Sequence, residues 1–259
     1  MSDIKIIFFD IDGTLIDMEK KQISEKILET LSKLKENGIR ICVATGRSPM
    51  LLPRFPGVEF DAYLTYNGSY CFDKHQDIFS HPLTRKDVYT IMDNAGRIGR
   101  PLSLATKNRL AANGTDEDLS AYYGIVGLKV EIADDFDTVA ENDEIYQIML
   151  GCYISEYEAV MRDVMDARIA AWWDRAVDII PRNSGKGTAI AKVLEHYHLT
   201  REEAMAFGDG NNDIEMLEAV GRGIAMKNAS PELKEVADDI CDDVADDGVY
   251  TYCKAAGMI

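Results

Sequence analysis

Cysteine is scarce in this sequence and forms no pattern that would indicate a metal centre or a disulfide framework. The five cysteines are scattered, odd in number and never in a CxxC spacing. We therefore expect neither structural zinc nor a disulfide scaffold, but reduced thiols in a cytoplasmic protein. Histidine is sparse too. The four histidines stand at no ligand spacing beside acids, which predicts structural or surface positions for them.

Long apolar segments are also missing. No window approaches the roughly 20 apolar residues that a transmembrane helix needs. No basic segment followed by a long apolar stretch opens the sequence, so we do not expect a secretory signal. The sequence thus predicts a soluble protein with no membrane partner.

Basic residues are few relative to acidic ones. Lys and Arg number 28 against 45 Asp and Glu, which gives a formal net charge of −17. This balance disfavours nucleic acid as a partner, because phosphate backbones require basic surface. It does not exclude a small phosphorylated substrate, since a few local cations or a metal ion can reverse the field in one pocket. With 259 residues, 46% of them hydrophobic, the chain can form one large domain or two ordinary ones.

Two apolar runs near the start of the sequence predict buried parallel strands. Residues 4–9 are mostly apolar without alternation, as expected for a strand covered on both faces, and residues 39–45 are the next predicted buried strand. The segment between them predicts a helix capped by Ser24 and ended by Gly38. Further on, Asn67-Gly68 between apolar runs predicts a hairpin with a tight turn.

The pattern changes near Pro82 and changes back after Pro181. The middle segment predicts helices over 84–98 and 155–165 among several short strands, which is an α+β pattern. The β–α rhythm then resumes. We therefore predict an α/β fold: a Rossmann-like doubly wound parallel sheet core from residues 1–82 and 182–259, with an inserted α+β cap domain at 83–181.

Polar residues follow three of the predicted core strands. The stretches are DIDGT (10–14), ATGR (44–47) and GDGNND (208–213), and Lys186 lies in SGKGT at the start of a predicted helix. In open α/β sheets, ligands bind outside the carboxyl ends of the strands. These four stretches converge if their strands are neighbours in the sheet.

These residue types match phosphoryl transfer through an aspartate. A carboxylate can act as a covalent nucleophile toward phosphorus. Its charge must be screened from an anionic phosphate, and Mg²⁺ suits clustered carboxylates. A second carboxyl two residues along an extended chain lies on the same side and can transfer protons. Thr45 and Lys186 can hold phosphate oxygens.

The four stretches, in this order and at these separations, resemble the four motifs of the haloacid-dehalogenase-like hydrolases. The Asn67-Gly68 hairpin, the insertion between the second and third motifs, and residues 208–238 resemble its Cof-type phosphatase branch. The resemblance implies a Mg²⁺-dependent phosphatase that acts on small phosphorylated metabolites through an aspartyl-phosphate. Sugar phosphates are the first expectation, followed by nucleotide or cofactor phosphates. The inserted domain would close as a cap and select the leaving group.

The resemblance also implies a role for each motif residue. Asp10 corresponds to the nucleophile and Asp12 to the general acid/base. The metal would be held by Asp10, the backbone carbonyl of Asp12, and Asp209. Thr45, Gly46, Lys186 and Asn212 would bind phosphate; Asp213 would act through water or by orienting Lys186; and Arg47 would face the cap.

Other interpretations remain open at the level of sequence. A phosphomutase or phosphotransferase would pass the phosphoryl group from Asp10 to a sugar hydroxyl instead of water. A non-catalytic module that binds a phosphorylated ligand is a third possibility, although the intact pair of Asp10 and Asp12 argues against it. Asp-Gly alone is a common turn, so the catalytic interpretation depends on all four motifs. We expect a monomer or a homodimer.

Overall fold

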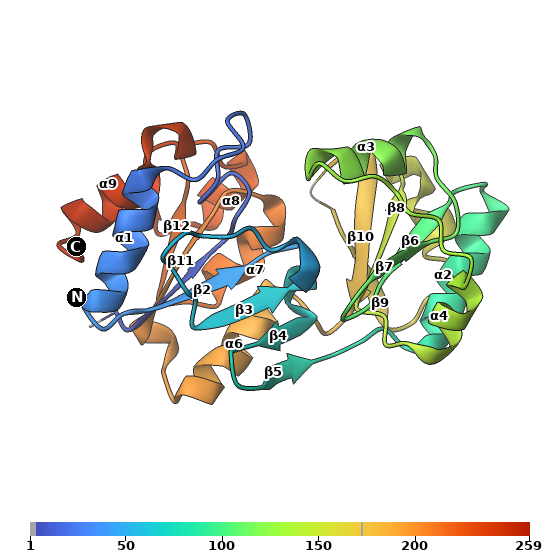
Figure 1. Ribbon diagram of the computed structural model, residues 1–259, viewed down its shortest axis with the longest axis horizontal. Coiled ribbons are helices and arrows are strands. Elements are labelled where there is room, and N and C mark those ends of the chain that lie inside the picture. Colours follow the sequence, from blue (N-terminus) through green and yellow to red (C-terminus); the bar gives the residue numbers. More distant parts are fainter. Residues whose placement is uncertain (1–3, 172) are drawn as a thin grey trace. The chain divides into compact units, whose positions relative to one another are not determined.

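The first apolar run forms strand β1 (Ile6–Phe9) in the computed structural model, which describes residues 4–171 and 173–259 (Figure 1). The chain divides into two units. The first contains the described residues up to Gly46, together with Leu52–Ser80 and Gly185–Ile259. The second contains Arg47–Leu51 and His81–Ser184. The first unit is therefore built from segments on both sides of a long insertion.

The first unit contains an eight-stranded sheet in the order β13-β12-β11-β1-β2-β3-β4-β5. The strands from β13 to β3 run parallel, and β4 and β5 are antiparallel additions at one edge. Besides β1, the strands are β2 (Arg40–Ala44), β3 (Ala62–Thr65), β4 (Tyr70–Phe72), β5 (Asp77–Ser80), β11 (Ala204–Gly208), β12 (Arg222–Ala225) and β13 (Asp239–Ile240). The order reverses at β1, between β2 and β11. This parallel core confirms the predicted doubly wound α/β fold.

Helices cover both faces of this sheet. They are α1 (Glu25–Glu36), α6 (Lys186–Tyr197), α7 (Ile214–Glu218), α8 (Pro231–Val236) and α9 (Gly248–Ala255). Helix α1 packs against α9, and α6 packs against α7. The predicted start of α1 is confirmed, because the Ser24 hydroxyl accepts a hydrogen bond from the Ile27 amide at 3.1 Å. Gly38, at φ +80°, follows the helix as predicted.

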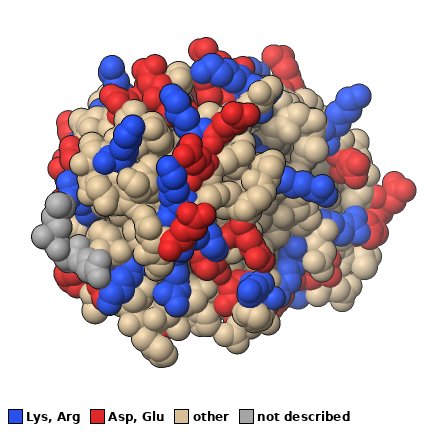
Figure 2. All heavy atoms as spheres, turned by 60° about the vertical axis from the view of Figure 1, so that its left-hand side comes forward, with Lys and Arg blue, Asp and Glu red and all other residues tan. Residues whose placement is uncertain are grey.

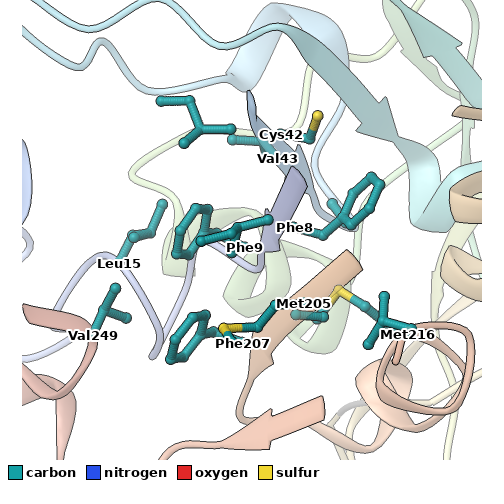
Figure 3. Close-up of a cluster of buried hydrophobic side chains, with 14 of the residues drawn as sticks. Phe8, Phe9, Leu15, Cys42, Val43, Met205, Phe207, Met216 and Val249 are labelled. Atoms are coloured by element: carbon teal, nitrogen blue, oxygen red, sulfur yellow. The ribbon is translucent and has the colours of Figure 1, made fainter. Parts of the chain in front are cut away.

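The hydrophobic core of the first unit is organised around β1 (Figure 3). Phe8 and Phe9 point to opposite faces of the sheet, as successive strand residues must (Figure 3). Phe9 stacks on Phe207 of β11, with ring centroids 5.5 Å apart and planes 8° apart. Both rings are fully buried. Burial of such a side chain contributes roughly 1.5–3 kcal/mol, so this pair helps to fix the register of β1 against β11.

The predicted hairpin at Asn67-Gly68 forms, but its turn is not the expected two-residue one. Thr65 pairs with Tyr70, which leaves four residues in the connection. Tyr66–Gly68 adopt a single 3₁₀ turn with φ values of 52°, 52° and 90°. The sequence supplies residues that tolerate positive φ at the second and third positions, but contacts outside the hairpin determine the length of the turn.

The second unit has a five-stranded antiparallel sheet in the order β7-β6-β8-β10-β9. Its strands are β6 (Leu102–Ala105), β7 (Leu110–Ala112), β8 (Gln147–Gly151), β9 (Ala167–Ala170) and β10 (Ala176–Pro181). Its helices are α2 (Arg85–Arg97), α3 (Glu117–Ile125), α4 (Phe136–Asn142) and α5 (Tyr157–Val160). Buried residues of α2, α4 and α5 share one apolar core with the sheet.

The helix expected over residues 155–165 is much shorter than predicted. Helix α5 ends at Val160. The side-chain amide of Asn94, from α2, donates hydrogen bonds to the carbonyls of Val160 and Arg162 at 3.0 and 2.7 Å. Those carbonyls are the acceptors that a longer helix would use, and Asp163 then adopts a left-handed conformation at φ 60°. A tertiary contact therefore ends the helix.

The described residues include no helix that is long and apolar enough to cross a bilayer. All five cysteines are buried, and none of them forms a disulfide. On the face shown in Figure 2, basic and acidic side chains are intermixed over the surface. The excess of acid in the composition is thus distributed there among interspersed cations.

Candidate active site

The site lies at the carboxyl ends of β1 and β11, where the strand order reverses. Phe9 is in register with Phe207, so Asp10 and Asp209 emerge from neighbouring parallel strands. The Asp10 amide continues the ladder by donating to the Phe207 carbonyl at 3.0 Å. This is the crevice in which open α/β sheets bind ligands. The predicted convergence of the first and last motifs is therefore present in the fold.

Lys186 ties Asp10 to Asp213 in a buried ion cluster. Its Nζ lies 2.6 Å from Asp10 Oδ1 and also donates to Asp213 Oδ1. The Lys186 side chain is 0% exposed. Burial opposes the charged form, but the negative charges of Asp10 and Asp213 outweigh it and raise the pKa of Lys186. The lysine thus stays charged at the first position of α6.

Asp213 is held by three donors. One of its oxygens accepts from Lys186, and the other accepts from the amides of Asp209 and Gly210 at 2.9 and 3.0 Å. Gly208 has no room for a side chain, because an added Cβ would lie 2.7 Å from the Asp213 carboxyl group. These contacts couple Asp213 both to Lys186 and to the shape of the loop that carries Asp209.

Asp209 lies against the DIDGT turn. The Thr14 hydroxyl donates to Asp209 Oδ1 at 3.0 Å. Gly13 adopts φ +89°, and a Cβ there would lie 2.2 Å from Asp209 Oδ2, so only glycine allows this approach. Burial, followed by the negative charge of Asp213, raises the pKa of Asp209 to about 7. The glycine of DIDGT therefore lets two acidic loops meet.

The carboxylates form a cluster that suits a cation. Oxygens of Asp10, Asp209 and Asp213 lie within 4.8 Å of one another. Burial raises the pKa of Asp10 well above its ordinary value; Lys186 opposes this shift, and the charges of Asp213, Asp209 and Asp12 add to it. Carboxylate oxygens are hard donors of the kind that Mg²⁺ and Ca²⁺ prefer. The donor set therefore fits a divalent cation.

Asp12 and Thr45 lie in the same unit, in loops after β1 and β2. Asp12 is half-buried and pairs through its backbone with Ile16. Thr45 is buried, and its backbone bonds to Leu64 and Asn67 at 2.8 and 2.9 Å. The cluster of carboxylates described above does not include the side chain of Asp12.

Gly46 and Asn212 meet at Asn67, whereas Arg47 belongs to the other unit. The Asn212 side-chain amide donates to Asn67 Oδ1 at 3.1 Å. A Cβ on Gly46 would lie 3.2 Å from the Asn67 side chain. Arg47 falls within the second unit, where its guanidinium donates to the Leu51 carbonyl at 3.1 Å. The structure thus brings Gly46 and Asn212 to one residue of the first unit, and Arg47 belongs to the second.

Three side chains at the site were missed by the sequence reasoning. Thr14 binds Asp209, and Asn67 binds Asn212. Asn228 donates to the Gly13 carbonyl at 2.8 Å and accepts from the Val244 amide. Thr14 stands inside the DIDGT motif, and the pattern around Asn67 predicts first of all a turn. No pattern in the sequence marked Asn228.

The fold and the four assembled motifs define a hydrolase class. A family model described as haloacid dehalogenase-like hydrolase matches residues 7–252, so the chain belongs to that family, as a Cof-type member. The family and its relatives identify the protein more narrowly as a phosphatase.

Individual relatives cover nearly the whole chain. The protein YkrA of Bacillus subtilis (strain 168) is 33% identical over 99% of both chains. The HMP-PP phosphatase of Citrobacter koseri is 27% identical over 88% of this chain and 86% of its own. A solved structure described as the HAD subclass IIB sugar phosphatase BT4131 is 28% identical, with a TM-score of 0.89 over 98% of this chain and 100% of its own.

Proposed function

We propose that the protein is a Mg²⁺-dependent phosphatase that hydrolyses small phosphorylated metabolites through a phosphate ester on Asp10. The observation that carries this proposal is the buried contact of Asp10 with Lys186, beside Asp209 at the reversal of strand order. A carboxylate in this setting is held by a permanent cation and oriented at the edge where substrates enter. Residues 83–181 would serve as the cap domain.

The carboxylates of Asp10 and Asp209, with the backbone carbonyl of Asp12, are the groups that would hold Mg²⁺. When bound, the cation screens the negative charge of the site and polarises a phosphoryl oxygen. The site holds more carboxylates than Lys186 can neutralise, and burial and mutual repulsion raise the pKa values of both Asp10 and Asp209. This uncompensated negative charge supports the proposal that a cation binds there.

The chain's own residues would then divide the chemistry. A carboxylate oxygen of Asp10 attacks phosphorus, and the bond from phosphorus to the leaving oxygen breaks while Asp12 gives that oxygen a proton. In the second step Asp12 takes a proton from water, whose oxygen attacks phosphorus and releases Asp10 and inorganic phosphate. Lys186, Thr45 and Asn212 hold the phosphoryl oxygens.

The names of the relatives support a substrate class. One similar structure is described as a sugar phosphatase, and one relative as an HMP-PP phosphatase. Sugar phosphates are therefore the first substrates to test, followed by nucleotide and cofactor phosphates.

The test is hydrolysis of an aryl phosphate by the purified protein with and without Mg²⁺. We expect Asp10→Asn to fold normally and to lose nearly all turnover, because an amide cannot form the phosphate ester. Glu19→Gln, which changes an exposed acid of the same segment, serves as the matched control and should keep full activity. Full turnover by Asp10→Asn would refute the assignment. Phosphorus NMR with added sugars would show whether the phosphoryl group passes to a hydroxyl instead of water.

A further inference from the structure

The turn between β3 and β4 contacts the loops that carry three of the four motifs. The Asn67 amide donates to the Thr45 carbonyl at 2.9 Å, and its side chain lies against Gly46. Its Oδ1 accepts from the side chain of Asn212. A Cβ on Gly68 would lie 2.4 Å from the Gly185 carbonyl, just before Lys186. One short turn thus touches the ATGR loop, the start of α6 and the GDGNND loop.

Asn67 is itself held tightly in this position. It is 2% exposed and adopts a left-handed conformation, φ 52° and ψ 32°. Asparagine is one of the few residues other than glycine that visit this region routinely. Such backbone conformations persist when the surrounding contacts determine them, and they cluster at functional sites.

We propose that Asn67 is a positioning residue for the phosphate-binding groups, a role that rests on the proposed function. Its backbone fixes the Thr45 carbonyl, and its side chain fixes both the path of Gly46 and the rotamer of Asn212. Thr45, Gly46 and Asn212 come from two strands on opposite sides of β1, so their spacing is not set by either loop alone. Asn67 sets that spacing from a third strand.

The experiment compares Asn67→Gly with the parent protein. Glycine keeps the left-handed backbone and deletes the side-chain contacts with Gly46 and Asn212. These groups would contact phosphate in both the ground state and the transition state. Loss of their positioning should therefore weaken the binding of both states about equally. We expect the dissociation constant for inorganic phosphate, measured with Mg²⁺ present, and the KM for an aryl phosphate to rise about tenfold. The kcat should change by less than about threefold.

His198→Gly is the matched control. His198 has the same left-handed backbone, φ 55° and ψ 41°, at the C-terminal cap of α6, and it is exposed. It should leave phosphate binding unchanged. In the Asn212→Ala background, adding Asn67→Gly should weaken phosphate binding by clearly less than the tenfold expected in the parent, because the part of its effect that acts through Asn212 is already lost.

Phosphate binding by Asn67→Gly within about twofold of the parent would overturn the proposal. If that variant fails to fold, Asn67→Asp keeps both the backbone and the acceptor for Asn212 while adding a negative charge beside the phosphate groups. It should weaken phosphate binding in a salt-dependent way, and unchanged binding would overturn the proposal equally. Absence of hydrolysis by the parent protein would contradict the proposed function, whereas the phosphate titration still tests Asn67 separately.

Discussion

Replacing Lys186 by methionine should destabilise the metal-free protein strongly, and more so as the pH rises. Methionine keeps much of the apolar stem but removes the charge that lies 2.6 Å from Asp10 and that also bonds Asp213. Both carboxyl groups stay buried, with side chains 9% and 1% exposed. Removing one partner of a buried ion pair costs about 3–5 kcal/mol, which is a large part of a typical free energy of unfolding.

The pH dependence follows from the sign of the pKa shifts. Burial and the neighbouring carboxylates raise the folded-state pKa of Asp10, and in the parent protein Lys186 opposes this shift, so removing Lys186 raises that pKa further. A carboxyl group whose pKa is raised on folding binds protons more tightly in the folded state, so acid stabilises the fold. The loss of unfolding free energy caused by Lys186→Met should therefore be greatest near pH 8 and should shrink by about half or more near pH 5.

Urea unfolding of both proteins in the presence of a chelator, at a series of pH values, measures this cost. Lys192→Met is the matched control on the same helix, because Lys192 is 46% exposed and forms an ion pair with the exposed Glu195 three residues along. It should cost less than about 1 kcal/mol at every pH. A cost for Lys186→Met below about 1 kcal/mol, or one that does not change with pH, would refute the reasoning.

Three further outcomes are expected. Burial and the charge of Asp213 raise the pKa of Asp209 to about 7, so the metal-free protein should lose stability as the pH rises from about 4 through 7. For the same reason, Mg²⁺ should raise the melting temperature more at about pH 8 than at about pH 5. Arg100→Lys should cost about 1–3 kcal/mol at neutral pH, because the two-pronged contact with Glu156 and the bond to Asp118 are lost. Gly68→Ala should cost roughly 3 kcal/mol, since it combines φ +90° with a Cβ 2.4 Å from the Gly185 carbonyl.

Each of these outcomes has its own check. The Asp209 prediction is checked by thermal melting with and without Mg²⁺. An equal rise in melting temperature at both pH values would contradict it. For the second, Arg109→Lys is the control, since Arg109 and Asp135 form a similar pair that is 43% and 52% exposed. Hydrogen bonding from Arg100 lowers the pKa of Glu156, so the stability that this pair contributes should vanish as the pH falls through that lowered pKa. If Arg100→Lys still destabilised the protein in acid, the result would contradict this explanation. For the third, Gly57→Ala at φ +75° meets nothing within 4 Å, and an equal cost for both variants would show that the contact with Gly185 is unimportant.

The core of alternating strands and helices could be predicted, because the local sequence pattern of each element agrees with its place in the fold. Strand β1 is apolar throughout, β2 is apolar after Arg40, and α1 carries its own cap at Ser24. The edge strand β13 of the first unit could not be predicted. Strand β13 contains only Asp239 and Ile240, in an acidic segment of low strand propensity. It forms because it pairs in parallel with the edge of β12.

The approach of Asp10 to Asp209 could be predicted because the DIDGT and GDGNND motifs each directly follow a recognisable strand. Asn67 and Asn228 could not be predicted as parts of the site. Their contacts depend on where β3 and the loop after β12 return in space, and no local spacing encodes that return. The length of the Tyr66–Gly68 turn is another case, because its contact with Gly185 crosses more than a hundred residues of sequence.

The pairing of β1 with β11 has a consequence for how the protein is made. Ile6 lies beside Ala204, so β1 leaves the ribosome 198 residues before its partner strand. At about 5–20 residues per second, that interval lasts roughly 10–40 s. The second unit, which ends at Ser184, can be completed within it, and for most of it Asp10 already exists and Lys186 does not. A nascent or truncated chain therefore carries the carboxylate at the end of β1 without the lysine that neutralises it, and the last segments synthesised must complete the site.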